Sequence, residues 1–175
     1  MKNLAFSFVL FLVSNVIFSQ SVFDKFEDKD GVTSVIVNKK MFELMGKMSI
    51  DAKEKDAQQY LNLLKKLENL KVFTTNDVKV AADMKATVAS YLKSNPLEEL
   101  MRVNDSGKKV NIYIKSSGNG EIVKELLMFI DETTGQEHQT VVLSLIGNFD
   151  LNEISALTEK MSLPGGDELK KASKK

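Results

Sequence analysis

Two kinds of hydrophobic pattern alternate along the first half of the chain. Residues 32–37 are rich in β-branched side chains and predict a strand, and residues 70–75 predict a second one. Three other segments carry apolar residues at the spacing of one helical face. These helical stripes are Met41, Met45 and Met48 with Phe42 and Leu44; Ala57, Tyr60, Leu61, Leu64 and Leu67; and Val78, Ala81, Ala82, Val88, Ala89 and Leu92.

Polar residues mark the ends of these predicted helices. Asp51 with Glu54 three residues later has the form of a capping box, and Asn76 or Asp77 can cap the third helix. Pro96 follows the third helix and closes it. A row of methionines can form an adaptable binding surface, but we expect the methionines of the first helix to fill the core.

The second half of the chain predicts a series of strands separated by short turns. Residues 97–103 fit either a helix or a strand, and we assign them to a strand. Residues 110–114 alternate apolar and polar side chains, the pattern of a half-buried strand. Two further strands, residues 122–130 and 139–146, flank a polar loop at 131–138, and Gly147-Asn148 ends the sheet. A last helical stripe consists of Leu151, Ile154, Leu157 and Met161, with Asp150 and Glu153 placed to cap it.

The resulting order, β-α-α-β-α-β-β-β-β-α, predicts an α+β fold. We expect a two-layer sandwich in which helices cover one face of a mostly antiparallel sheet of about five to six strands. The alternating strands indicate that part of the other face is in contact with water. Residues 21–163 would form this single domain, and residues 164–175 a mobile, Lys-rich tail.

Residues 1–20 have the layout of a secretory signal peptide. Lys2 precedes an apolar run at residues 4–18, and small or polar residues follow it. A retained membrane anchor is the alternative, but a spanning helix needs about 20 apolar residues, and this run is shorter. We expect cleavage between Ser19 and Val22 and a periplasmic or secreted domain with no transmembrane span.

Composition excludes several classes of site. The chain has no cysteine, so it has no disulfide, no thiolate metal site and no lipid anchor on cysteine. Its 24 basic residues balance 24 acidic ones, and all but Arg102 of the basic residues are lysines. Because phosphate and guanine recognition favours the arginine fork, nucleic acid is not an expected partner.

Candidate catalytic and metal-binding residues are few. Asp28, Asp30 and Gly31 match three positions of a calcium loop, but Phe26 and Val37 would then occupy two ligand positions, so a turn is the better interpretation. His138 is the only histidine, and Ser144 on the same strand is about 20 Å away, too far to share a proton with it. The remaining candidates, which have ordinary surface or turn explanations, are the acidic pairs Glu98-Glu99 and Asp131-Glu132 and the glycine turn Gly118-Asn119-Gly120. We therefore predict no catalytic, cofactor or metal site.

Lysine pairs offer a weak electrostatic surface. Acidic neighbours dilute Lys39-Lys40, Lys65-Lys66 and Lys108-Lys109. The tail, with Lys170, Lys171, Lys174 and Lys175, is less diluted and could contact a membrane surface weakly.

Two segments resemble a known family. They are Phe23-Asp24-Lys25-Phe26 leading through residues 30–37 to Lys40-Met41-Phe42, and residues 143–151 leading into the last helix. Both are similar to the exported bacterial family of domain of unknown function 4252, common in Bacteroidetes. The resemblance implies a small envelope protein, with some relatives near sigma-factor and anti-sigma genes, and it supplies no active-site residues.

Together these observations favour a non-catalytic envelope domain that binds a protein partner or ligand. The resemblance alone suggests a regulatory component of a sigma and anti-sigma system, and a hydrolase with an unrecognised active site is the third alternative. The identity of the partner and the oligomeric state stay open.

Overall fold

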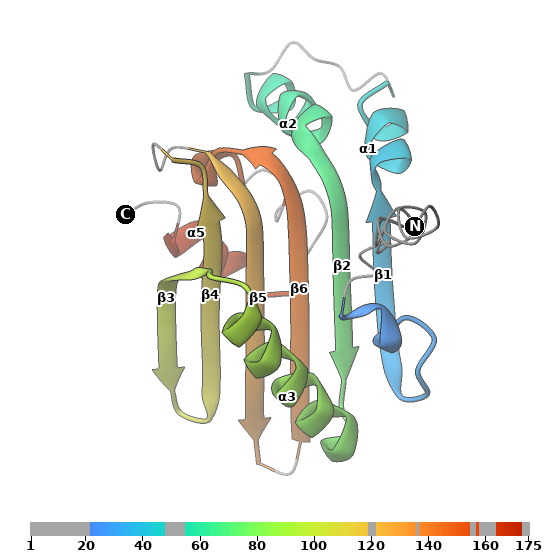
Figure 1. Cartoon of the computed structure of the whole chain (residues 1–175), viewed down its shortest axis with the longest axis vertical. Helices are drawn as coiled ribbons and strands as arrows, with labels where there is room; N and C mark the ends of the chain where they lie inside the picture. Colours follow the sequence, from blue (N-terminus) through green and yellow to red (C-terminus); the bar gives the residue numbers. More distant parts are fainter. Residues whose placement is uncertain are drawn as a thin grey trace, which may run out of the picture.

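A six-stranded antiparallel sheet forms the centre of the computed structural model, which describes residues 22–47, 55–118, 122–135, 137–154, 157 and 164–172. Its strands run in the order β1-β2-β6-β5-β4-β3 (Figure 1). The α+β class and the predicted order of elements are confirmed. The strands are β1 (Val32–Asn38), β2 (Leu67–Thr75), β3 (Glu98–Asp105), β4 (Lys108–Ser116), β5 (Val123–Thr134) and β6 (Glu137–Phe149); the helices are α1 (Lys39–Met45), α2 (Lys55–Lys66), α3 (Val78–Ser94) and α5 (Gly166–Ala172), with 3-10 turns η1 (Asp24–Phe26) and η2 (Leu151–Glu153).

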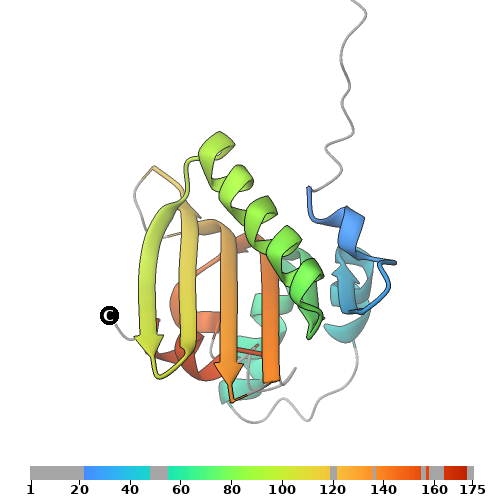
Figure 2. The same cartoon turned by 90° about the horizontal axis from the view of Figure 1, so that it is seen from below.

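Helices cover both faces of this sheet. α1, α2 and α5 pack on one face, and α3 and η1 pack on the other (Figure 2). β6 shows why both faces need cover. Val141 and Leu143 are buried in the core on the side of α1, α2 and α5, here called the first core, whereas Val142 is buried in the second core, on the side of α3 and η1. The expected placement of all helices on one face is therefore corrected: β5 and β6 are buried on both sides, and the apolar runs at 126–130 and 141–145 face both cores.

The strand assignment of residues 97–103 is confirmed by β3, but the last hairpin is longer than expected. The segment 131–138, expected to be a polar loop, consists mostly of paired strand, with Asp131 opposite Thr140 and Thr133 opposite His138. Likewise, Gly147-Asn148 does not end the sheet, because β6 continues to Phe149. Polar side chains are compatible with strand pairing at the tip of the hairpin, and the fully buried Phe149 extends β6 past the glycine. The polarity of the sequence therefore placed both strand ends incorrectly.

The buried stripe of α3 also differs from the predicted one. Asp77 caps the helix, accepting hydrogen bonds from the backbone N–H groups of Lys79 at 2.8 Å and Val80 at 3.0 Å. The buried side chains are Val80, Met84 and Val88, whereas Val78 is 62% exposed. Because alanines lie on several sides of this helix, the sequence pattern does not reveal which face is apolar. The buried Met84 identifies that face.

The methionines of α1 do not fill the core as expected. Phe42 is the buried side chain of this helix, Met41 is 50% exposed, and Met45 is only partly buried. Asn38 caps the helix by accepting a 3.0 Å hydrogen bond from the backbone N–H of Met41. Met48, the capping box at Asp51 and the signal segment lie outside the described residues.

The Lys-rich segment after residue 164, expected to be mobile, contains helix α5. Leu169 and Ala172 of this helix are buried in the first core. Gly165 precedes it with φ +74°, and a Cβ there would lie 2.6 Å from the Met128 methyl group. This close approach lets the chain turn against β5. Among the described residues, no helix combines the length and apolarity needed to cross a bilayer.

Replacing Leu169 tests whether α5 is part of the folded core. We expect Leu169→Ala to lower the free energy of unfolding by about 2 kcal/mol, because it removes a buried side chain and leaves a cavity. Urea unfolding followed by circular dichroism measures the change. Lys171→Ala, on the exposed side of the same helix, should stay within about 0.5 kcal/mol of the wild type. Equal stability of the two variants would mean that α5 does not pack on the core.

Candidate functional site

The two edges of the sheet differ in chemistry. β1 is paired on one side only, with β2, and its seven residues include no charged side chain. β3 at the opposite edge carries Glu98, Glu99, Arg102 and Asp105. Charged side chains on an edge strand discourage pairing with another chain. The β3 edge has this protection and the β1 edge lacks it.

Exposed apolar side chains gather along β1 and α1. Val35 is 45% exposed on one face of β1, and Ile36 is 43% exposed on the other. α1 follows β1 directly and turns Phe42 inward, which leaves Met41 and Leu44 about half exposed. These four residues, here called the edge band, account for four of the seven large hydrophobic side chains that are exposed in the described part of the chain.

A short segment in front of β1 fixes the position of this edge. In this clamp segment, residues 23–29, Phe23 and Phe26 are buried in the second core. The Phe26 ring centroid lies 5.9 Å from that of Phe73, and the Phe23 centroid lies 5.3 Å from that of Tyr91. The clamp segment therefore covers the sheet face beside α3.

Lys71 ties the clamp segment to the middle of β2. Its side chain is 12% exposed and forms ion pairs with Asp24 and, at 2.6 Å, with Glu27. Burial by itself lowers the pKa of Lys71, but the hydrogen bonds to the two carboxylates outweigh it and raise the pKa. The Ser34 hydroxyl donates to the Glu27 carbonyl oxygen at 2.6 Å, so the same segment also contacts β1.

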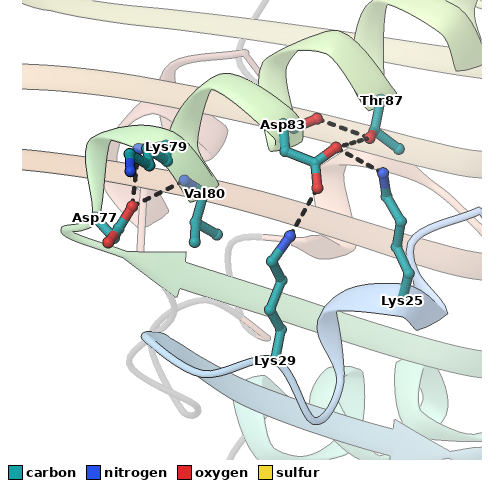
Figure 3. Close-up of polar contacts among 7 residues, drawn as sticks. All are labelled: Lys25, Lys29, Asp77, Lys79, Val80, Asp83 and Thr87. Carbon is teal, nitrogen blue, oxygen red and sulfur yellow. Dashed lines mark hydrogen bonds and ion pairs between the residues drawn. The ribbon is translucent and has the colours of Figure 1, made fainter.

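A second set of ion pairs joins the clamp segment to α3 (Figure 3). The carboxylate of Asp83 accepts hydrogen bonds from Lys25 at 2.7 Å and Lys29 at 2.8 Å. These two lysines lower the pKa of Asp83 to about 2. At the start of the helix, the backbone N–H groups of Val80 and Lys79 lower the pKa of the capping Asp77. The clamp segment is thus held to β1, β2 and α3 together.

The structure does not bring His138 and Ser144 together. His138 is exposed near the start of β6, with Nδ1 3.0 Å from the Thr133 hydroxyl oxygen. Ser144 is buried six residues further along the same strand, opposite Leu127. A cavity of about 200 Å³ beside His138 includes Asp131, whose carboxylate lies 3.8 Å from Lys85 Nζ.

The acidic pairs are also separated. Asp131 faces Lys85, whereas Glu132 points to the other face, 3.8 Å from Lys108. In β3, Glu99 binds Arg102, with 3.2 Å between its carboxylate and Nε. Neither pair places two carboxylates around one space, as acid and base catalysis on a glycosidic bond requires.

The other candidates have structural roles. Residues 28–31 form a turn in which the Val32 N–H donates to the Lys29 carbonyl at 3.1 Å and Gly31 adopts φ +77°. Of the glycine turn, only Gly118 is described. Within the described ranges, no group of three or more His, Asp or Glu side chains is arranged to hold a metal ion.

Each of the three lysine pairs includes a member that forms an ion pair with a carboxylate, Lys40 doing so with Glu43 at 3.5 Å. Lys66 Nζ lies 2.7 Å from Glu153, and Lys108 Nζ lies 2.9 Å from Glu168. Lys39 and Lys40 are exposed where β1 passes into α1. Lys174 and Lys175 lie outside the described residues.

Sequence reasoning missed Lys71 and Asp83, the two residues on which the clamp segment converges. A signal for Lys71 was present, since it is the one charged residue among the apolar and β-branched residues at 70–75. Such a lysine, at a position facing the interior, needs acidic partners from elsewhere in the chain. Asp83 gives no such signal, because charged residues are ordinary on a helix surface.

One of the two segments that carry the family resemblance, Phe23-Asp24-Lys25-Phe26, belongs to the clamp segment. Its residues have structural roles, because Phe23 and Phe26 are buried and Asp24 and Lys25 form ion pairs. The model of the family described as Domain of unknown function (DUF4252) matches residues 26–157. The chain belongs to the DUF4252 family. The comparison with curated proteins gives no match.

A solved structure with limited similarity to this DUF4252 domain is the Ran-binding protein Mog1p of Saccharomyces cerevisiae. It is 16% identical, and the match covers 60% of this chain and 63% of that chain, less than two thirds of its length. The TM-score is 0.28, too low for a structural argument.

The Asp83 contacts predict a dependence of stability on pH. A carboxyl whose pKa falls from about 3.9 in the unfolded chain to about 2 in the folded one stabilises the fold above pH 4. Because the side chain is 36% exposed, screening reduces this to about 1 kcal/mol, which Asp83→Asn should lose at pH 7.

Urea unfolding at a series of pH values measures this effect. The difference between the wild type and Asp83→Asn should shrink as the pH falls from about 4 to about 2, because Asp83 then becomes protonated in the folded state too. Glu137→Gln, at an exposed residue of β6, is the control and should not reproduce this profile. A difference independent of pH would contradict the assigned ion pairs.

Proposed function

We propose that this DUF4252 protein is an exported, non-catalytic interaction domain of the cell envelope that binds another protein chain at its β1 edge. The observation that carries the proposal is the uncharged strand β1, whose outer edge pairs with no other strand among the described residues, together with its edge band. An open strand edge offers a row of backbone donors and acceptors to an extended chain, and neighbouring apolar side chains supply contact area.

The contacts behind β1 support this role. The clamp segment is fixed by Lys71 and Asp83, and Ser34 in the middle of the strand bonds directly to it. The Thr75 hydroxyl adds a 2.6 Å hydrogen bond to the Gly31 carbonyl oxygen at the start of the strand. A strand held in place before binding loses little conformational freedom when a partner pairs with it.

The export part of the proposal rests on residues 1–20. A protein recovered from the envelope or the medium of its native host should lack about the first 20 residues, because the signal is removed on export. Intact-mass spectrometry measures this directly. Recovery of the full-length chain from the cytoplasm alone would contradict export without bearing on the binding edge.

Photo-crosslinking in the native host tests the binding edge. A crosslinking amino acid in place of Met41 should form adducts with a protein chain, and the same group in place of the exposed Lys115 on β4 should not. Adding Val35→Lys should reduce the adducts at position 41 about fivefold or more, because a charge on the edge strand opposes pairing.

The matched control is Glu98→Lys, which inserts the same charge into the opposite edge strand. It should leave the adducts at position 41 unchanged, and circular dichroism should show that both lysine variants remain folded. Adducts that form equally at both positions, or that survive Val35→Lys, would contradict binding at β1. Saturable turnover of an envelope substrate that is lost in His138→Ala would instead support an enzyme.

A further inference from the structure

The sequence of β1 is compatible with antiparallel pairing to itself. A two-fold axis through Val35 sets Val35 opposite Val35 of a second copy, Ser34 opposite Ile36, and Thr33 opposite Val37. Each pair then lies on one face of the joined sheet, as strand alternation requires. All seven residues of β1 are paired in this register, whereas moving the axis by one residue leaves one end of the strand unpaired.

We propose that the chain bound at the β1 edge is a second copy of this protein, paired antiparallel about Val35 in a symmetric dimer. This inference rests on the proposed function and names the occupant of the same edge. The two six-stranded sheets then form one continuous sheet, and each β1 edge is covered by the other. Such an isologous contact closes on itself and leaves no growing end.

The side chains along the strand fit this register. Val35 is 45% exposed in one copy and would contact its equivalent, a β-branched pair that stabilises adjoining strands. On the other face, Ile36 would lie opposite the small Ser34, whose hydroxyl is already turned toward the Glu27 carbonyl. A small side chain opposite a large one leaves room for packing at the point where the clamp segment contacts the strand.

Charges at the two ends of β1 favour the antiparallel direction. The exposed residues Asp28 and Asp30 precede the strand, and the exposed residues Lys39 and Lys40 follow it. Antiparallel pairing brings the acidic end of each copy to the basic end of the other, with Asp30 and Lys40 equally distant from the axis. Lys40 Nζ lies 3.5 Å from the carboxylate of Glu43 in its own chain, a contact between exposed side chains. Parallel pairing would instead place like charges together.

The opposite edge of the sheet is a poorer partner for β1. β3 presents Glu98 as an exposed acidic residue, and pairing with the uncharged β1 would offer it no complementary charge. A contact between β1 and β3 would also be head-to-tail and could propagate into a filament. Chemistry and symmetry both favour pairing of β1 with β1.

The absence of cysteine makes self-contact directly measurable. Any single introduced cysteine can form a disulfide only with the same position of another copy. Residues opposite each other in an antiparallel pair have Cα atoms about 4.5–5.5 Å apart, within the range of a disulfide. Val35→Cys should therefore crosslink under mild oxidation about tenfold faster than Thr33→Cys. The two copies of residue 33 lie on opposite sides of the two-fold axis, too far apart to form a disulfide.

Sedimentation equilibrium of the mature chain supplies the second measurement. We expect a dimer with a dissociation constant of about micromolar order, since the strand and edge band form an interface at the small end of the range. Asp30→Lys or Lys40→Asp alone should weaken the dimer about threefold, and the double variant should restore it because the charges are exchanged. Arg102→Cys on β3 is the crosslinking control for the other edge.

The outcomes separate this inference from the proposed function. Rapid crosslinking of Val35→Cys in a dimer that depends on these charges supports self-pairing. A monomer at about 200 µM, or crosslinking of Val35→Cys no faster than that of Thr33→Cys and Arg102→Cys, overturns it. If that monomer still forms Val35-dependent adducts with a different protein at position 41, the binding function stands and only the second copy is wrong. If neither is observed, both are wrong.

Discussion

Burial of the central strands on both faces is the constraint on which the rest of the structure depends. β2, β5 and β6 present apolar side chains to two cores, so both sides of the sheet need covering elements. α1, α2 and α5 cover one side, but on the other side α3 does not extend over β1 (Figure 2). Phe23 and Phe26 of the clamp segment contribute to the remaining cover. This arrangement places the charged Lys71 beneath that segment, where Asp24 and Glu27 neutralise it.

The sequence was sufficient to predict the class of fold and the order of its elements. Residues 110–114 identify a strand by alternation, and Asp77 identifies a helix start by capping, since both signals are local. The face of α3 was mispredicted because alanines lie on several sides of it and Met84 was overlooked. α5 was mistaken for a mobile tail because one buried leucine and one alanine are a weak hydrophobic signal in a segment rich in lysine.

The candidate site was less predictable than the fold. Val35 and Ile36 look like ordinary strand residues in sequence, and only the strand order shows that their strand is an edge. The contrast with β3 is likewise a property of the assembled sheet, because charged strands occur in many positions. The ion pairs of Lys71 and Asp83 join residues more than 40 positions apart, which no local pattern reveals.

The attachment of the clamp segment differs in kind from that of the strands. Backbone ladders and apolar packing, which hold the sheet, respond little to ionic strength. The pairs of Lys25 and Lys29 with Asp83 are partly exposed, so dissolved ions screen them. The support in front of β1 therefore contains salt-sensitive contacts, and the ionic composition of the surrounding compartment acts on the edge strand before it acts on the core.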